Sequence, residues 1–248
     1  MTKQDSKQVS ENERRRADIG DDIIIANELS LNLPSADGMV NIIKNITFSI
    51  PKGKKIAITG PSGSGKTSLL MLLAGLERPS AGTLRVHNTD IHHKDDNALT
   101  AFRNTHIGIV FQEFHLMPTM SALENVALPL ELRRGETDIY NKAHIMLESV
   151  GLKHRLHHYP SQLSGGEQQR TAIARACITA PDIMLADEPT GNLDQSTGQL
   201  IINVLFDMQQ HHQSTLLLIT HDEHLAAQCD IQIHMRDGGI ETIKEHRS

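Results

Sequence analysis

Short apolar runs recur along the chain, each bounded by polar or turn-forming residues. The runs at residues 55–59, 106–111, 182–186 and 215–220 are dominated by Ile, Leu, Val, Ala and Met. Nearly continuous apolar runs of this length are typical of strands that are buried on both faces. Because helical patterns separate the runs, the sequence predicts an α/β fold with a mainly parallel sheet.

A different pattern precedes these runs. Residues 41–50 alternate between apolar and polar positions, which predicts a half-buried strand. Ordered structure is expected to begin at residues 23–26, and residues 83–86 form another short strand. Alternation favours antiparallel pairing with one solvated face. The sequence therefore predicts an N-terminal antiparallel β subdomain beside the parallel core.

Helical spacing, capping residues and glycine stops predict helices in seven further segments. The segments are residues 68–74, 98–104, 122–130, 138–150, 164–179, 199–210 and 223–229. Residues 113–165 contain two helices with no strand between them, so we interpret them as an inserted helical subdomain. We interpret residues 21–248 as one domain and the polar residues 1–20 as a disordered arm.

The amino-acid composition and net charge limit the classes of protein to which this chain can belong. The chain has 248 residues, of which 38% are hydrophobic and 22% charged, as in ordinary globular proteins. Its net charge of −6 gives no support to nucleic-acid binding. Cys177 and Cys229, the two cysteines, favour a reducing compartment. No apolar run reaches the length of a membrane span, and acidic residues follow the arginines at 14–16, so export is not expected.

The glycine-rich segment at residues 60–68 fits the pattern G-x-x-x-x-G-K-[ST] of a phosphate-binding loop. Its residues are Gly60, Pro61, Ser62, Gly63, Ser64, Gly65, Lys66, Thr67 and Ser68. Glycines let the backbone turn tightly, so that its N–H groups converge on an anion. Lys66 places a positive charge at the outer phosphates, and the Thr67 hydroxyl can ligate Mg²⁺. The loop leaves a predicted strand and enters a predicted helix, as the motif requires.

An acidic pair, Asp187 and Glu188, follows the apolar run at residues 182–186. A carboxylate at the tip of such a strand is where phosphate-loop NTPases hold a Mg²⁺ ligand. Glu188 is placed to accept a proton from attacking water, a contribution typically worth about 10²–10⁴-fold in rate. The alternative is a pair of acids in a solvated loop, and the phosphate loop upstream argues against it.

Residues 163–170 read Leu-Ser-Gly-Gly-Glu-Gln-Gln-Arg and contain a capping box between Ser164 and Glu167. A well-capped helix does not explain Gly165 and Gly166, because each glycine costs about 1 kcal/mol in a helix. The two glycines indicate that a ligand or a neighbouring group approaches the backbone closely here. Because a helix N-terminus attracts negative charge, an anion is the favoured ligand.

These motifs, in this order, resemble those of ATP-binding cassette (ABC) proteins. Residues 163–169 resemble the family's signature, Gln112 its glutamine loop, and His221 its switch histidine. Residues 192–194 match the loop that follows the acidic pair. The resemblance implies a P-loop NTPase cassette with a RecA-like, mainly parallel core, an antiparallel β subdomain and an inserted helical subdomain.

The resemblance also implies a role for each matching residue. The catalytic residues would be Glu188, which polarises the attacking water, His221 and Gln112. Mg²⁺ would be held by Thr67, Gln112 and Asp187. ATP would be bound by the phosphate loop of one copy and by three signature residues of another, Ser164, Gly165 and Gly166. Asp194 would contact the facing subunit.

Longer stretches of the sequence resemble one subgroup of the ABC family in particular. Residues 111–129 and 186–194 are similar to the subgroup of lipoprotein-release, macrolide-efflux and cell-division cassettes. Within it, residues 134–136, 197–198 and 225–230 are most similar to the branch called YbbA. One departure concerns the nucleotide base, because no aromatic residue lies near Leu33, where the family stacks adenine. The missing contact costs roughly 1–3 kcal/mol by analogy with base stacking, so the choice between adenine and guanine stays open.

Two other groups of residues are interpreted mainly as solvent-exposed surface or as protein core. Histidine pairs at residues 92–93, 157–158 and 211–212 fit no standard metal-ligand spacing and are interpreted as solvated surface. An apolar run after Gln112 is interpreted mostly as core of the helical subdomain, and in part as a groove for a helix of a membrane partner. The run comprises Phe114, Leu116, Met117, Met120, Leu123 and Val126.

The resemblance implies an ATPase that binds ATP and Mg²⁺ and forms a homodimer. It would drive a separate integral membrane, permease-like subunit from the cytoplasmic face of the inner membrane. The alternative is a regulatory module that uses the same dimer to signal to a periplasmic or cell-division partner, and the motifs do not separate the two. A DNA- or ribosome-associated ATPase would need coiled-coil arms or a second cassette, which this sequence lacks, so no nucleic-acid partner is expected. Substrate recognition would reside in the partner.

Overall fold

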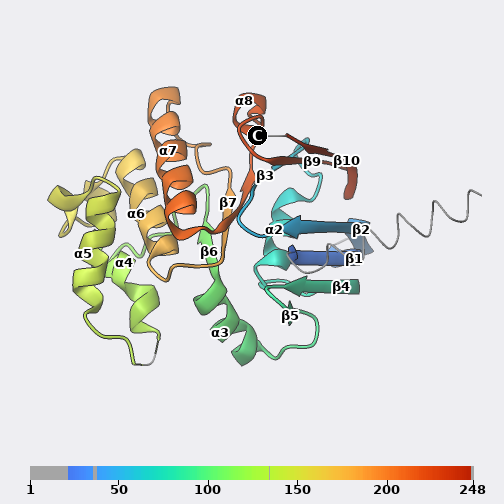
Figure 1. Ribbon diagram of the computed structural model, residues 1–248, viewed down its shortest axis with the longest axis horizontal. Coiled ribbons are helices and arrows are strands. Elements are labelled where there is room, and N and C mark those ends of the chain that lie inside the picture. Colours follow the sequence, from blue (N-terminus) through green and yellow to red (C-terminus); the bar gives the residue numbers. More distant parts are fainter. Residues whose placement is uncertain (1–21, 36–37, 134, 247–248) are drawn as a thin grey trace, which may run out of the picture.

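Two β-sheets form the framework of the protein (Figure 1). The computed structural model describes residues 22–35, 38–133 and 135–246. The disordered arm predicted at residues 1–20 lies outside these residues. One sheet is mainly parallel, the other is antiparallel, and helices flank them, which confirms the predicted α/β fold class.

The smaller sheet has the strand order β2-β1-β4-β5 and is antiparallel, as predicted. Its strands are β1 (Asp22–Ser35), β2 (Gly38–Pro51), β4 (Ala81–Val86) and β5 (Thr89–Asp90). The sequence predicts only the start of β1. The pairing register shifts between Ala26 and Leu29, where Glu28 has a φ of 49°. A bulge adds a residue to one strand and so breaks the alternation by which strands are recognised.

The larger sheet has the strand order β10-β9-β3-β8-β7-β6. Its strands are β3 (Lys55–Thr59), β6 (Ile107–Val110), β7 (Ile183–Asp187), β8 (Thr215–Ile219), β9 (Ile231–Arg236) and β10 (Gly239–Glu245). The four predicted buried strands are confirmed and pair in parallel. The antiparallel hairpin of β9 and β10 is absent from the prediction, although Asp237 and Gly238 between alternating residues are a hairpin signal.

Different helices cover the two faces of the larger sheet. The helices of this core are α2 (Lys66–Leu73), α3 (Asp96–His106), α6 (Gly165–Cys177), α7 (Gln195–His212) and α8 (Glu223–Ala226). Helix α2 and the smaller sheet pack on the face that presents Ile56 and Leu185. Helices α6 and α7 pack on the face that presents Ala57 and Met184. Because side chains alternate along a strand, neighbouring residues of one apolar run supply both faces.

A helical region lies at one side of the sheet, at the left of Figure 1. It comprises α4 (Ala122–Glu131), α5 (Ile139–Ser149), η1 (Lys153–Arg155) and η2 (Pro160–Gln162). Val126 and Leu147 belong to a small core of its own, which also includes Ala174 of α6. Met117, from the apolar run before α4, is 43% exposed. The exact limits of the inserted subdomain stay a prediction.

Helix α7 begins earlier than its pattern predicts. Its first residue is Gln195, because the Asp194 side chain accepts a hydrogen bond from the Thr197 N–H at 3.0 Å and caps the helix. No helix in the described part of the chain combines the length and the hydropathy that crossing a bilayer requires.

Candidate active site

The predicted phosphate loop joins β3 to α2 and wraps around the ammonium group of Lys66. The Lys66 side chain donates hydrogen bonds to the carbonyl oxygens of Gly60 at 2.9 Å and of Pro61 at 3.0 Å. Gly60 has a φ of 140°, and a Cβ atom there would lie 2.1 Å from the carbonyl oxygen of Met235. Only glycine fits beside β9 at this point, so the hairpin that the sequence analysis missed shapes the loop.

A cavity of about 290 Å³ lies beside the loop. It is lined by Ile42, Ser62, Gly63, Gly65, Lys66, Thr67, Ser68 and Glu188. The other predicted loop residues lie behind this lining: Gly60 and Pro61 hold Lys66, and Ser64 is buried. A lysine, hydroxyl groups and a helix N-terminus at one cavity fit an anion such as a polyphosphate.

Asp187, the last residue of β7, lies beside the Thr67 side chain, whose hydroxyl group favours the ionised carboxylate. Burial raises the pKa of Asp187, and the nearby Glu188 acts in the same direction, while Thr67 and Lys66 oppose them. A bound cation would favour the ionised carboxylate. Thr67 and Asp187 thus offer two adjoining oxygen donors, the kind of ligand that Mg²⁺ prefers.

Glu188 has an unusual backbone conformation at the cavity wall. Its φ of 42° lies in the left-handed region, which residues other than glycine rarely adopt. The Glu188 N–H donates to the carbonyl oxygen of Ile219 at 3.1 Å, which ties it to the end of β8. Its carboxylate lies 3.6 Å from Nδ1 of His221, the residue predicted as the switch histidine. Adjacent strand ends therefore bring these two predicted residues together.

Gln112 follows β6, and within the described residues it is not part of the cavity lining. Its Nε2 donates to Oδ1 of Asn192 at 3.3 Å, and its carbonyl oxygen accepts from Nδ2 of Asn192 at 3.2 Å. The glutamine loop is thereby joined to the loop that leads to Asp194.

Ser164 and Asp194 each cap a helix. The predicted capping box is confirmed, because Ser164 Oγ accepts from the Glu167 N–H at 3.3 Å and Glu167 Oε2 accepts from the Ser164 N–H at 2.8 Å. The Asp194 carboxylate accepts hydrogen bonds from Ser196 and Thr197, and they hold its pKa far below the usual range. The N-termini of α6 and α7 are therefore both capped by side chains of the same chain, without a second copy.

The two signature glycines face neighbours in the same chain. A Cβ atom at Gly166 would lie 2.5 Å from Cγ2 of Thr197, and one at Gly165 would lie 3.2 Å from Cδ2 of Leu193. Close packing of α6 against the start of α7 is thus a second reason for bare backbone, besides the approach of an anion.

The signature residues lie apart from the phosphate cavity within one chain. Helix α2, with Leu69, belongs to the core on one face, whereas α6, with Ile173, belongs to the core on the other. Among the described residues, none of the segment 164–166 lines the phosphate cavity. One chain therefore brings together the phosphate loop, Asp187, Glu188 and His221. Its own signature residues, 164–166, do not join this site.

A family model described as ABC transporter matches residues 43–191. The chain belongs to the ABC transporter family. The matched segment includes the phosphate loop, Gln112, the signature and the acidic pair, which confirms the resemblance drawn from these motifs. As an ABC cassette, the protein is the ATP-binding and ATP-hydrolysing part of an ATP-driven transport system.

Relatives of this ABC cassette include the lipoprotein-releasing system ATP-binding protein LolD of Treponema denticola, 43% identical over 90% of this chain and 99% of that protein. The uncharacterized ABC transporter ATP-binding protein YbbA of Escherichia coli K12 is also 43% identical, over 89% of this chain and 97% of that protein. The dimeric cassette MJ0796, solved with ADP and Pi after hydrolysis, has a TM-score of 0.85 at 35% identity, covering 91% of this chain and 99% of its own. The predicted subgroup is confirmed.

The contacts of two α6 residues were not predicted from the sequence: Gln169 was named only as part of the signature, and Arg175 was not named. Gln169 is fully buried, and its Nε2 donates to the carbonyl oxygen of Pro189 at 2.7 Å, just beyond the acidic pair. Arg175 donates to the carbonyl oxygens of His115 at 2.6 Å and of Phe114 at 2.9 Å, just beyond Gln112. The signal for Gln169 was its place at an apolar position of the helical period.

Proposed function

We propose that this ABC cassette hydrolyses ATP within a dimer of two copies and thereby drives a separate membrane subunit. The observation that carries the proposal is that, among the described residues, none of the signature residues 164–166 lines the phosphate cavity of its own chain. Each chain then supplies the phosphate loop of one site and the signature of the other.

The phosphate loop, residues 60–68, holds the phosphates of ATP, with Lys66 at the outer phosphates. Thr67, Gln112 and Asp187 are the residues that would hold Mg²⁺, which supplies neutralising charge on the phosphate oxygens when it is bound. The contact between Thr67 and Asp187 supports this assignment. For Gln112 the assignment requires its side chain to exchange its present partner, Asn192, for the metal site.

Glu188 acts as the base that orients the attacking water and accepts its proton. The bond from its backbone N–H to Ile219 fixes the backbone of Glu188 at the cavity wall. His221, 3.6 Å from that carboxylate, is placed to steady it and to contact the terminal phosphate. Gln112 completes the catalytic set, because its backbone carbonyl oxygen keeps the bond from Asn192 and ties it to the loop at residues 192–194 while its side chain turns to the metal site.

In the dimer, the N-terminus of α6 in one copy faces ATP bound by the other. Gly165 and Gly166 offer backbone N–H groups to the terminal phosphate, Ser164 offers its hydroxyl group, and α6 offers the positive end of its dipole. Asp194 caps α7 and directly follows Leu193, whose side chain lies near Gly165, and it contacts the facing subunit. The dimeric state of the similar cassette MJ0796 supports this arrangement.

The partner is an integral membrane subunit, and the cassette docks on it from the cytoplasmic face of the inner membrane. Met117 is 43% exposed and lies in the segment between Gln112 and α4. We infer that motion of the active site passes to the membrane subunit through this segment. The relative LolD is named for lipoprotein release, which favours a role in export or in work on a lipid-linked substrate. The membrane subunit, not the cassette, recognises that substrate.

Heterodimers of marked chains test the two-chain site. A Lys66→Ala chain paired with a Ser164→Arg chain retains one intact composite site, so ATPase activity is expected. A wild-type chain paired with a Lys66→Ala/Ser164→Arg chain retains none, although it carries the same two substitutions. Activity in the first pairing and its loss in the second support the proposal. Activity only in the pairing with the double variant, or no activity in either pairing, contradicts a site shared between chains.

A further inference from the structure

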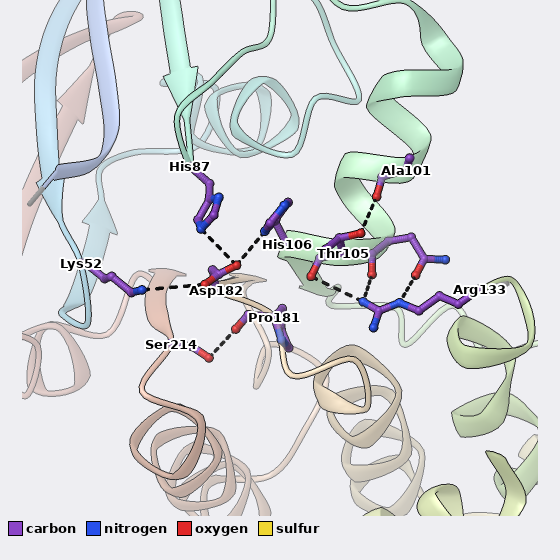
Figure 2. A network of polar contacts seen from close by, with 10 residues as sticks. Lys52, His87, Ala101, Thr105, His106, Arg133, Pro181, Asp182 and Ser214 are labelled. Atoms are coloured by element: carbon purple, nitrogen blue, oxygen red, sulfur yellow. Dashed lines mark hydrogen bonds and ion pairs between the residues drawn. The ribbon is translucent and has the colours of Figure 1, made fainter. Parts of the chain in front are cut away.

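Three side chains from distant segments converge in one polar cluster (Figure 2). The cluster lies at the edge of the larger sheet where β7 begins, away from the phosphate cavity. His87 lies in the turn between β4 and β5, His106 is the last residue of α3, and Asp182 directly precedes β7. One ligand atom from each lies within 4.8 Å of the others. Asp187 stands at the other end of β7, about 16 Å away for a strand of this length.

Both imidazole rings approach the same carboxylate oxygen. Oδ2 of Asp182 lies 2.7 Å from Nδ1 of His106 and 3.3 Å from Nε2 of His87. The two rings stack with their centroids 4.1 Å apart. A tetrahedral ion with bonds of about 2.0–2.2 Å holds its ligand atoms roughly 3.4 Å apart. The His87 distance to the carboxylate is close to this value and the His106 distance is shorter, while the two nitrogens lie within 4.8 Å of each other.

Hydrogen bonds fix the backbone on which His87 and Asp182 stand. The His87 N–H donates to the carbonyl oxygen of Ile23 at 2.7 Å, and the turn holds His87 in the left-handed region, with a φ of 45°. The carbonyl oxygen of Asp182 accepts from the Thr215 N–H at 2.8 Å. These bonds hold both residues in place on the backbone before any ligand is bound.

His106 is held by a cap on the end of α3. Arg133, from the segment after α4, donates to Oδ1 of Asn104 at 2.7 Å and also contacts the carbonyl oxygens of Asn104 and Thr105 (Figure 2). The Thr105 hydroxyl in turn donates to the Ala101 carbonyl oxygen at 2.9 Å. The cap links the helical region to the residue that presents one imidazole.

The cluster is partly open to solvent. The side chains of His87, His106 and Asp182 are 33%, 26% and 29% exposed, so water can reach the site and complete a ligand set. Lys52 lies 3.9 Å from the other carboxylate oxygen of Asp182, and its side chain is 60% exposed. This flexible ammonium group can move into solvent when a cation binds.

We propose that His87, His106 and Asp182 form a binding site for a divalent transition-metal ion such as Zn²⁺, separate from the Mg²⁺ site. Two imidazoles and one carboxylate are a ligand set that suits Zn²⁺, with water in the fourth position. The ion would join the β4–β5 turn to α3 and to the start of β7. It would thus fasten the antiparallel sheet to the parallel sheet at the edge away from ATP.

The test uses the full chain, stripped of metal with a chelator and free of nucleotide. Titration with Zn²⁺ by calorimetry, and with Co²⁺ by visible absorption, is expected to show one tight equivalent per chain. Bound Zn²⁺ should also raise Tm, because the three ligands are brought together only in the folded state. His87→Gln and His106→Gln should each weaken binding by about tenfold or more and remove the rise in Tm, in line with the loss of a metal-ligand contact.

The matched control is the double variant His92→Gln/His93→Gln, which removes two exposed histidines near Asp90 and should leave the tight equivalent intact. Circular dichroism and ATP binding without Zn²⁺ establish that each variant is folded. Wild-type protein that binds Zn²⁺ no more tightly than the His87→Gln variant would show that the cluster is only a hydrogen-bonded network. Loss of the tight equivalent in the control variant would place the metal on the surface histidines and overturn the proposal.

Discussion

Gln112 and Asn192 are joined by two hydrogen bonds, one from each side chain. Gln112 Nε2 donates to Asn192 Oδ1 at 3.3 Å, and Asn192 Nδ2 donates to the Gln112 carbonyl oxygen at 3.2 Å. The two residues are 80 positions apart in the chain. The segment that leads to the helical region is thereby linked to the segment that leads to Asp194 and α7.

Breaking this link should slow hydrolysis more than it weakens nucleotide binding. Asn192→Ala removes both hydrogen bonds, each worth about 0.5–1.5 kcal/mol, so kcat is expected to fall by about two- to tenfold. ATP affinity should change little, because Asn192 lies outside the cavity lining within the described residues. Asn203→Ala, which removes a hydrogen bond from Gln199 on the exposed side of α7, is the matched control. A loss of ATP affinity without a loss of kcat would contradict the prediction.

Substitution of the proposed base should separate binding from hydrolysis. Glu188→Gln keeps the shape of the side chain but cannot accept the proton, so kcat should fall by about 10²–10⁴-fold. The ATP-bound dimer should then persist, as measured by size-exclusion chromatography with light scattering. Glu223→Gln, at the exposed start of α8, should hydrolyse ATP normally. A Glu188→Gln protein that stays monomeric at saturating ATP would count against the dimer.

The close packing of Gly166 against the Thr197 methyl group should make glycine necessary for stability at position 166. Gly166→Ala places a Cβ atom 2.5 Å from Cγ2 of Thr197, and such overpacking typically costs about 1–3 kcal/mol. Thr197→Ser removes that methyl group and keeps the hydroxyl. The double variant should therefore recover the lost stability in urea unfolding, aided by the better helix propensity of alanine. Additive effects of the two substitutions would exclude this clash as the cause.

The capping carboxylate of Glu167 should make stability depend on pH. Burial opposes its ionisation, but hydrogen bonds from Ser164 and Arg155 outweigh burial and lower the pKa of Glu167. The ionised group therefore stabilises the folded state above its ordinary pKa of about 4.3, and this contribution disappears as pH falls through the lowered value. Glu167→Gln should cost stability at pH 7 and progressively less below about pH 4. Exposed Glu113→Gln is the control. A difference from wild type that does not change with pH would refute the assignment.

Nucleotide choice should be weak, because Ile42 is the apolar residue at the cavity and no aromatic residue stands beside it among the lining residues. GTP should therefore compete with ATP. Leu33 pairs with Val40, which lies two residues before Ile42 on β2. Leu33→Tyr should add a stacking contact worth roughly 1–3 kcal/mol, measured as tighter ATP binding by calorimetry. Leu33→Met is the control, and equal effects of both substitutions would argue against stacking.

The sequence alone determined the elements whose signals are local. The phosphate loop, the buried strands and the Ser164–Glu167 capping box each depend on residues a few positions apart, so spacing and side-chain type identify them. The order of these motifs also sufficed to place the chain in its family. The bulged part of β1 was missed because an inserted residue interrupts the alternation of its pattern.

Only the tertiary structure decided which of these elements meet. Strand order places β7 between β8 and β6, so that Glu188 meets His221, and it leaves α6 on the face opposite α2. The same folding brings His87 and His106 to Asp182, although 76 positions separate Asp182 from the nearer histidine. No local pattern records such encounters, because they follow from sheet pairing and core packing across the whole chain.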